Sequence, residues 1–354
     1  MTASPDRPLR YADAGVDIEA ADATVARYRA IAARTMRPEV LGGVGPFAAL
    51  WHLGSGYRDP VIVSSTDGVG TKLKIAAAAS RFDTIGQDLV NHCVNDIFTA
   101  GAEPLFFLDY LATADLTQDQ RVAIVGGMGL ACEQHGMTLI GGETADMPDV
   151  YAPGDFDIAG FIVGAVERAA VIDGSRIAPG DALIALPSNG LHTNGYSLVR
   201  QAFGIGKGLD AVRDRAILDR EYEELGGTLG DALLAVHTSY YAALKPLLPN
   251  VHGIAHITGG GIPGNLPRIF EPHIGADLDA ASWTVPPLFQ LIQREGNVEA
   301  AEMFRAFNMG VGIIVAVAEA DAEAVLAELP NGWRIGTIVE RRDGAPPVRG
   351  VPGT

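Results

Sequence analysis

The sequence predicts an α/β protein of the mixed α+β kind, built from two domains. At 354 residues the chain exceeds the size at which one hydrophobic core usually stops growing, which favours two domains of about 150 to 180 residues over one large domain. In both halves, apolar runs alternate with glycine-bearing loops and helix-like stretches. Near residues 168–175 an apolar block ends and the strand and turn pattern starts again, so we place the boundary there.

The ends of the chain differ in composition from its interior. Both are rich in proline, glycine and small or polar residues, which is typical of flexible termini. We therefore expect a flexible segment at residues 1–17, an N-terminal domain at 18–170, a C-terminal αβ domain at 171–340 and a flexible tail at 341–354.

Apolar spacing and turn residues locate the main elements. In the N-terminal domain they predict helices at 18–34 with Asp17 as N-cap, at 84–100 and at 117–134, another beginning near Lys72, and strands at 47–53, 61–63, 105–108, 137–140 and 156–168. In the C-terminal domain they predict a helix after Asn194, a long helical region at 222–247, a flexible glycine loop at 259–264 and a strand at 312–317.

Charge and cysteine content exclude several classes of function. The formal net charge of -17 argues against a nucleic-acid partner, because phosphate contacts need clustered lysine and arginine. Cys93 and Cys132 are the two cysteines and both lie in apolar stretches, which indicates core thiols in a reducing compartment. The sequence shows no apolar run long enough for a bilayer and no signal-peptide pattern, so we expect a cytoplasmic protein without a membrane partner.

Acidic residues dominate one stretch of the N-terminal half. Between residues 82 and 167 the only lysine or arginine is Arg121, whereas carboxylates are numerous. Two interpretations stay open, an acidic solvated surface and a site whose cation comes from elsewhere. The carboxylates concerned include Asp88, Asp96, Asp109, Glu143 and Asp146.

One predicted helix carries a polar stripe opposite its apolar face. Asp88, His92 and Asp96 are four residues apart, and Asn91 and Asn95 fall beside them. Eight residues of helix separate the two aspartates by roughly 12 Å, so they cannot bind the same ion. Oxygen ligands of this kind suit Mg²⁺, and the cysteines and histidines lack the spacing of a zinc motif.

The loop after the predicted strand at 61–63 combines groups that a magnesium nucleotide needs. It reads Ser-Thr-Asp-Gly-Val-Gly-Thr-Lys over residues 65–72 and offers a carboxylate, glycines, a hydroxyl and an ammonium. It lacks the Walker A spacing, which disfavours a P-loop fold. The alternative is a tight strand-to-helix turn with Asp67 as a cap.

Three further loops are candidates for binding groups. Residues 141–146 place Glu143 directly after a buried strand, where binding groups often lie. A capping role of Thr144 or Asp146 is an equally natural interpretation of this loop. In the second half, residues 189–195 precede a helix and residues 256–261 form a glycine loop, and either could hold a phosphate on backbone amides. A lone histidine before a helix, such as His192, is more often structural than catalytic.

Several long segments together resemble the aminoimidazole ribonucleotide synthetase (phosphoribosylformylglycinamidine cyclo-ligase) family. They cover about residues 11 to 340 in order: YADAGVDIEA, LGGVGPFAALW, SSTDGVGTKLKIA, IGQDLVNHCVNDIFTAGAEPLFFLDYLAT, GGETADMP, DIAGFIVGAVER, SNGLHTNGYSLVR and HITGGGIPGNLPR. The resemblance implies two αβ domains and a homodimer whose N-terminal strands combine into a barrel-like sheet. It also implies ATP-dependent ring closure of formylglycinamidine ribonucleotide in purine synthesis, with Mg²⁺ as cofactor.

The resemblance also implies roles for individual residues. Asp67, Asp96 and Glu143 match positions for magnesium or magnesium-ATP, and Gly68, Gly70, Thr71 and Lys72 match positions along the nucleotide phosphates. His192, Asn194, Thr258, Gly259 and Gly260 would lie toward the ribonucleotide substrate, and Asp67, Lys72 and His192 are the implied catalytic groups. The chain departs from the family at Ala12 and at Ala114-Asp115, where lysine and Gly-Lys are common, which puts local nucleotide contacts in doubt.

Two other classes of function compete with this interpretation. One is another ATP-using member of the same superfamily, such as thiamine-monophosphate kinase, selenophosphate synthetase or the synthetase one step earlier in purine synthesis. The other is a non-catalytic scaffold, which should have lost some of Asp67, Lys72, Asp96 or Glu143. All four are present. The match at residues 11–17 further suggests that the N-terminal segment closes over bound ATP.

Overall fold

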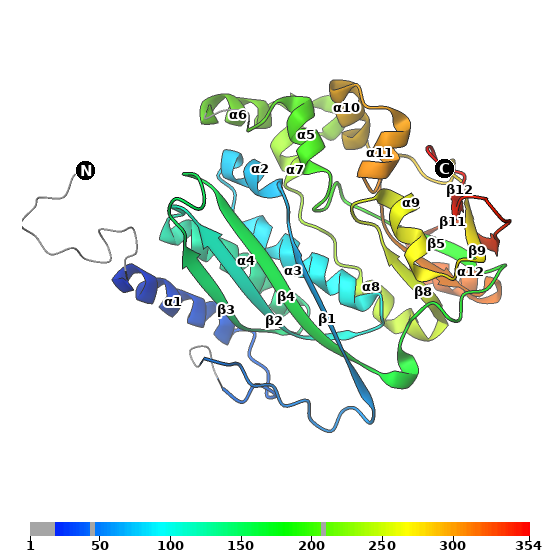
Figure 1. Cartoon of the computed structure of the whole chain (residues 1–354), viewed down its shortest axis with the longest axis horizontal. Helices are drawn as coiled ribbons and strands as arrows, with labels where there is room; N and C mark the ends of the chain where they lie inside the picture. Colours follow the sequence, from blue (N-terminus) through cyan, green and yellow to red (C-terminus); the bar gives the residue numbers. More distant parts are fainter. Residues whose placement is uncertain (1–17, 43–46, 207–209) are drawn as a thin grey trace, which may run out of the picture.

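The computed structural model describes residues 18–42, 47–206 and 210–354 (Figure 1). The expected flexible segment at 1–17, its Asp17 cap and its closure over ATP lie outside these residues. Each half of the chain forms its own sheet with helices beside it, and the two halves lie next to each other, with the N-terminal half on the left of Figure 1. A mixed αβ architecture in two parts, as predicted, is confirmed.

The N-terminal half is a four-stranded sheet of long, curved strands in the order β1-β4-β2-β3. The strands β1 and β4 and the strands β4 and β2 are antiparallel, whereas β2 and β3 are parallel and are connected through α4. The elements are α1 (Ile18–Ala33), β1 (Pro60–Gly68), α2 (Lys72–Ala79), α3 (Asp83–Phe98), β2 (Glu103–Thr113), α4 (Gln118–Gln134), β3 (Thr138–Asp146) and β4 (Phe156–Glu167).

The helices α3 and α4 cover one face of this sheet. Helix α4 begins with the capping box of Thr117 and Gln120, which satisfies two backbone N–H groups that a helix start leaves free. Close packing under α3 needs a residue without a side chain, because a Cβ at Gly160 would lie 2.3 Å from Phe107. The helices at 84–100 and 117–134 and the strand at 156–168 are thereby confirmed within one or two residues.

The other face of the N-terminal sheet stays open in the single chain. Side chains alternate along β1 and β4, as in a sheet with one buried face. The outward positions nevertheless carry apolar residues, and Ile62 and Phe161 are 56% and 44% exposed. This open apolar face bears on the assembly of the protein.

The C-terminal half holds a six-stranded sheet in the order β12-β9-β11-β5-β10-β8. The central strands β5 and β10 are almost entirely apolar and buried, so both faces of the sheet centre are covered. The strands are β5 (Ala182–Pro187), β8 (Val251–His256), β9 (Ile274–Leu278), β10 (Val311–Val317), β11 (Trp333–Glu340) and β12 (Val348–Arg349), beside a small sheet of β6 (Glu221–Tyr222) and β7 (Gly227–Thr228). The helices are α5 (Tyr196–Phe203), α6 (Ala211–Leu218), α7 (Leu229–Leu233), α8 (Tyr241–Leu244), α9 (Gly261–Asn265), α10 (Pro287–Gly296), α11 (Ala300–Ala306) and α12 (Ala322–Ala327).

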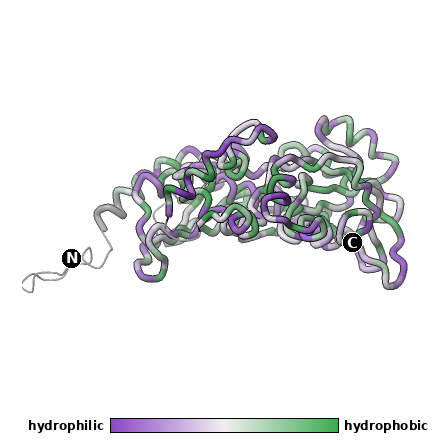
Figure 2. The backbone as a smooth tube through the Cα atoms, turned by 90° about the horizontal axis from the view of Figure 1, so that it is seen from above, coloured by the Kyte–Doolittle hydropathy of each residue, from purple (hydrophilic) through white to green (hydrophobic). Residues whose placement is uncertain are grey.

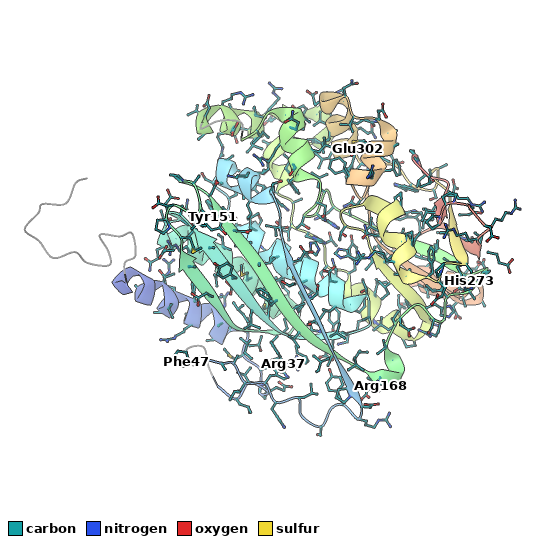
Figure 3. The ribbon with its side chains drawn as sticks, viewed as in Figure 1. Arg37, Phe47, Tyr151, Arg168, His273 and Glu302 are labelled. Atoms are coloured by element: carbon teal, nitrogen blue, oxygen red, sulfur yellow. The ribbon has the colours of Figure 1, made fainter. Side chains whose placement is uncertain are left out.

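Two of the predicted elements, a strand and a long helix, do not form. The expected strand at 47–53 is irregular chain, in which Trp51 makes one isolated bridge to Val40. Phe47 marks the beginning of this segment in Figure 3. The expected long helix at 222–247 is a series of short pieces, because Gly226 takes a left-handed backbone and residues 235–240 are irregular chain held by hydrogen bonds to Asp88, Asn91 and Asn95 of α3.

The tail at 341–354, expected to be flexible, belongs to the C-terminal sheet. Its strand β12 pairs in parallel with β9. Arg349 donates two hydrogen bonds of 2.7 Å to the Asp277 carboxylate, and Val348 and Val351 are buried. A proline- and glycine-rich composition is thus compatible with an edge strand. The prediction of a flexible tail at 341–354 is wrong for the residues around β12.

The two halves meet along α3. Helix α3 contacts α8 and β8, and α2 contacts α6 and α7. Figure 2 shows the two lobes side by side from above, with apolar backbone segments running through both interiors. Among the described helices, none is long and apolar enough to cross a membrane.

Candidate functional site at the junction of the two halves

The polar stripe of α3 faces the C-terminal half and is buried. Asp88 Oδ1 accepts a hydrogen bond of 2.8 Å from the backbone N–H of His237, and Asn91 Nδ2 donates to the His237 carbonyl at 2.8 Å. Asn95 Nδ2 donates to the Thr238 carbonyl at 2.8 Å, while its Oδ1 accepts from the Tyr240 N–H at 2.9 Å. The stripe therefore satisfies backbone groups of residues 237–240, and the alternative of an acidic solvated surface is wrong for Asp88.

Lys72 lies inside the same junction. Its side chain is fully buried, and its Nζ lies 2.8 Å from Asp88 Oδ2. The ammonium also donates to the carbonyl oxygens of Ala235 at 2.8 Å and His192 at 3.2 Å. Burial lowers the pKa of Lys72 and raises the pKa of Asp88, and the attraction between the two charges opposes both shifts. These contacts use the ammonium donors inside the protein, so the expected role of Lys72 on the nucleotide phosphates is corrected to an internal ion pair.

A cavity of about 560 Å³ opens beside the stripe. Both halves of the chain line it, with β1 and α3 on one side and β8 and the following loop on the other. It combines carboxylates, hydroxyls and one guanidinium, a mixture that suits a ligand carrying phosphate and metal. Its polar lining includes Ser65, Asp67, His92, Asp96, His256, Thr258 and Arg268.

Two aspartates in this cavity are held by histidines. His92 Nε2 lies 2.9 Å from Asp67 Oδ2 and 3.8 Å from Asp96 Oδ2, and His256 Nδ1 lies 2.8 Å from Asp96 Oδ1. Burial alone would raise the pKa of each aspartate, but hydrogen bonds from the histidines lower the pKa of both below the usual value. Burial lowers the pKa of His92 as well, yet the hydrogen bond to Asp67 and the charge of Asp96 raise it overall. Asp67 and Asp96 are therefore ionised and fit the oxygen ligands that Mg²⁺ prefers.

Glu143 is not brought to this cavity. Glu143 on β3 lies opposite Tyr110 on β2, which lies opposite Ala159 on β4, which in turn lies opposite Gly68 on β1. Three strand spacings, about 14 Å, therefore separate Glu143 from the loop of Asp67. Within one chain, the expected magnesium set of Asp67, Asp96 and Glu143 is thus split between two places.

Glu143 instead lines a second cavity of about 240 Å³ between α1, α4 and β3. Tyr28, Asp109, Arg121 and Asp146 line it too, and Arg121 is paired with Asp146. Burial raises the pKa of Asp109 to about 7, and the neighbouring Glu143 carboxylate acts in the same direction.

The glycine loops of the two halves lie against each other. A Cβ at Gly70 would be 3.8 Å from the Thr193 carbonyl, and the Thr71 hydroxyl lies 3.0 Å from that of Ser197. Asn194 Oδ1 would lie 3.1 Å from a Cβ at Gly259, which places these two predicted substrate groups side by side. The left-handed backbone of Gly260 starts α9 at Gly261, so the glycine loop predicted at 259–264 is wrong beyond Gly260.

The largest differences between the predicted and the observed site concern His192, His237 and Arg268. His192 is buried with 2% of its surface exposed, so its ring does not point into open solvent. Sequence reasoning did not select His237 or Arg268 at all. No local pattern marks His237, whereas Arg268 follows the glycine loop by a few residues and could have been noted as its nearest cation.

Comparison with known proteins identifies the class to which this fold and site belong. The model of the AIR synthase related protein N-terminal domain matches residues 48–166, and that of the AIR synthase related protein C-terminal domain matches residues 178–348. The chain belongs to the AIR synthase related protein family.

Curated relatives narrow the class to one kind of enzyme. The phosphoribosylformylglycinamidine cyclo-ligase of Aromatoleum aromaticum is 49% identical over 350 residues, 97% of this chain and 98% of that protein. The protein of the same name from Bordetella petrii is 48% identical over 352 residues, again 97% of this chain and 98% of that protein. These matches span both halves of the chain and the junction between them.

Solved structures share the fold at low sequence identity. Thiamine-monophosphate kinase from Stenotrophomonas maltophilia K279a has a TM-score of 0.63 and 20% identity, covering 91% of this chain and 95% of its own. Hydrogenase maturation protein HypE in complex with ATP has a TM-score of 0.62 and 18% identity, covering 91% and 87%. At this identity the likeness concerns the fold alone.

Proposed function

We propose that this chain catalyses the ATP-dependent cyclisation of formylglycinamidine ribonucleotide to aminoimidazole ribonucleotide, releasing ADP and phosphate, in de novo purine synthesis. The observation that carries the proposal is the identity of 49% over 97% of the chain with a protein named phosphoribosylformylglycinamidine cyclo-ligase. The ionised pair of Asp67 and Asp96 in a cavity between the halves supports it. The reducing environment that the two free cysteines suggest agrees with a cytoplasmic location.

In this reaction the formyl oxygen of the substrate takes the γ-phosphoryl group of ATP, an amidine nitrogen then attacks the activated carbon, and phosphate departs with that oxygen. Phosphoryl transfer depends mainly on positioning and on neutralising charge, and Mg²⁺ bound to carboxylates would supply the neutralisation. In our proposal Asp67 and Asp96 hold the ion, because both are ionised and face the same cavity.

The remaining anionic groups need donors from the chain. We assign the nucleotide phosphates to the loop of Gly68, Gly70 and Thr71, whose glycines allow backbone amides to approach an anion. The substrate phosphate is assigned to residues 258–260 at the start of α9 together with Arg268, whose guanidinium can bind phosphate through two hydrogen bonds. Asn194 lies beside this loop and completes the proposed substrate side.

The open apolar face of the N-terminal sheet supports a homodimer as part of our proposal. A large exposed apolar face on a soluble protein marks an interaction surface, and Ile62 on β1 and Phe161 on β4 are exposed on this face. Two such sheets whose edge strands pair, with their apolar faces turned inward, would form a closed barrel without free edges. If β1 of one copy pairs with β3 of the other, Glu143 of one copy approaches Asp67 of the other, which reunites the three carboxylates of the magnesium set.

The assembly is tested with Phe161→Asp. A buried charge at this face should turn the dimer into a monomer in size-exclusion chromatography with light scattering, while Val212→Asp, at another exposed apolar residue on α6, should leave the dimer intact. A wild-type protein that is monomeric at micromolar concentration would contradict the proposed dimer.

The activity is tested by ADP release with Mg²⁺ and ATP, with and without formylglycinamidine ribonucleotide. We expect release that depends on this substrate, and a loss of roughly a hundredfold or more in Asp67→Asn. Asp119→Asn, which changes an exposed carboxylate on α4, is the matched control and should retain activity. Folded protein that binds ATP without turning the substrate over would favour the scaffold function instead.

A further inference from the structure

Thr193 lies where the C-terminal half contacts the polar stripe of α3. It belongs to the loop before α5, between His192 and Asn194, and 6% of its surface is exposed. Its hydroxyl oxygen lies 2.6 Å from Nδ1 of His92 on α3. The other nitrogen of that ring, Nε2, lies 2.9 Å from Asp67 Oδ2. A side chain of the C-terminal half thus reaches a proposed magnesium ligand through one imidazole ring.

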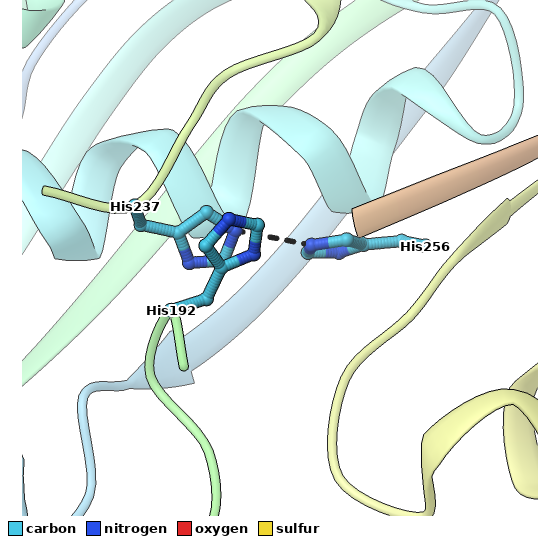
Figure 4. A group of neighbouring side chains, drawn as sticks. All are labelled: His192, His237 and His256. Carbon is cyan, nitrogen blue, oxygen red and sulfur yellow. Dashed lines mark hydrogen bonds between the residues drawn. The ribbon is translucent and has the colours of Figure 1, made fainter. Parts of the chain in front are cut away.

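The hydrogen bonds around His237 fix the position of its proton. Asn95 is oriented by its two backbone partners, so its Nδ2 donates to His237 Nε2 at 3.2 Å. Burial lowers the pKa of His237, which keeps the ring neutral, and its single proton is therefore on Nδ1. This Nδ1 lies 3.4 Å from the Thr193 hydroxyl oxygen. The ring itself is held by stacking on His192, with centroids 4.0 Å apart (Figure 4).

The remaining contacts give the Thr193 hydroxyl proton one acceptor. A hydroxyl group offers one donor and two lone pairs. The lone pairs accept from His237 Nδ1 and Asn194 Nδ2, each at 3.4 Å, so the O–H donates to His92 Nδ1 at 2.6 Å. The proton of a neutral His92 ring is then on Nε2, from which it is donated to Asp67. The hydroxyl of Thr193 therefore selects the tautomer of His92 that binds Asp67.

The backbone beside Thr193 is held by the protein as well. The carbonyl oxygen of His192 accepts hydrogen bonds of 3.2 Å from Lys72 Nζ and from the Tyr196 hydroxyl. His192 and Gly195 both have left-handed backbones, with φ of 59° and 79°, a conformation that is uncommon for residues other than glycine. The fold thus sets the position of the Thr193 hydroxyl.

We propose that Thr193 is a positioning residue of the metal site, which holds His92 in the tautomer and orientation that direct Asp67 toward the ion. This inference rests on the proposed function, which assigns Asp67 to magnesium. Valine at position 193 would remove the hydroxyl at nearly constant volume and leave Nδ1 of the buried His92 ring without its partner. The ring proton would then favour Nδ1, and a lone pair on Nε2 would face the Asp67 carboxylate and repel it.

The experiment uses full-length protein with Mn²⁺ as the metal probe, in the presence of ATP and without ribonucleotide. Water-proton relaxation reports binding, since Mn²⁺ enhances it more strongly on a slowly tumbling protein. We expect Thr193→Val to bind Mn²⁺ about 10- to 100-fold more weakly than the wild type, the usual effect of removing a group that orients a metal ligand. Thr193→Ser keeps the hydroxyl and should bind as the wild type does. Thr284→Val, which changes an exposed threonine of the C-terminal half, is the matched control and should do the same.

A double-variant cycle tests whether Thr193 acts through His92. His92→Asn should weaken Mn²⁺ binding by itself, because Asp67 loses its hydrogen-bond donor. Adding Thr193→Val to His92→Asn should change the Mn²⁺ affinity by less than about twofold, since no ring is left for the hydroxyl to hold. In turnover assays Thr193→Val should raise the Mg²⁺ concentration for half-maximal rate, and saturating Mg²⁺ should restore most of kcat.

Equal Mn²⁺ affinity in Thr193→Val and wild type, or effects of Thr193→Val and His92→Asn that add in full, would overturn the proposal. If Thr193→Val does not fold, Thr193→Ala, which also lacks the hydroxyl, takes its place in both comparisons. Wild-type protein that binds Mn²⁺ but does not turn the ribonucleotide over would contradict the proposed function alone. The Mn²⁺ affinities would still decide the role of Thr193.

Discussion

The ion pair of Lys72 and Asp88 provides the sharpest test of how the junction is built. Replacing Lys72 by Met keeps the length of the side chain but leaves Asp88 buried without its counter-charge, 2.8 Å from where the ammonium was. Breaking a buried pair from one side costs about 3–5 kcal/mol. The carbonyl oxygens of His192 and Ala235 also lose their hydrogen-bond donor. We therefore expect Lys72→Met to lower the free energy of unfolding by an amount within this range.

The assay is urea unfolding at pH 7.5, followed by circular dichroism. The double variant Lys72→Met with Asp88→Asn should recover most of the loss, because the Asn oxygen still accepts from the His237 N–H and no buried charge remains. ATP affinity of the folded Lys72→Met protein should change little. A destabilisation below about 1 kcal/mol together with a large loss of ATP binding would refute this reasoning and would return Lys72 to the nucleotide phosphates.

Three further outcomes follow from other residues. The pKa of Asp109 is about 7 in the folded chain, whereas the ordinary value of an aspartate is 3.8. The protonated Asp109 side chain therefore contributes its full stability below pH 4, and this contribution is lost as the pH rises through 7. Asp109→Asn should therefore raise the free energy of unfolding at pH 8, by at most about 4 kcal/mol, and leave it nearly unchanged at pH 4, as urea titrations at both values would show. Arg349→Ala should make the tail sensitive to limited proteolysis, since it removes both hydrogen bonds to Asp277, whereas an unchanged cleavage rate would mean that pairing of β12 suffices. Arg268→Lys should raise the KM for the ribonucleotide about tenfold with a smaller change in kcat in steady-state assays, and an unchanged KM would remove Arg268 from the substrate site.

Local pattern was enough to predict much of the fold. The helix at 84–100 and the helix at 117–134 have clear apolar spacing and end signals, and both formed where expected. The region at 222–247 failed because alanine and leucine favour helix locally, while Gly226 and the packing of residues 235–240 on α3 impose another path. Intrinsic propensity is a weak guide where long-range contacts decide.

The site was predictable in its residue types and less so in its geometry. Asp67 and Asp96 were selected from chemistry and resemblance, and the structure places them in one cavity. Burial of Lys72 could not be foreseen, because it depends on Asp88 and on carbonyls more than a hundred residues away. The distance of Glu143 depends on strand order, which a linear pattern does not contain.

The central claim is that this chain transfers a phosphoryl group to the formyl oxygen of its substrate and then closes the ring. The most direct measurement uses formylglycinamidine ribonucleotide labelled with oxygen-18 at the formyl group, together with ATP, Mg²⁺ and purified protein. We expect one labelled oxygen in each phosphate released, together with imidazole product in equal amount. Unlabelled phosphate, or phosphate released at the same rate without the ribonucleotide, would contradict the account.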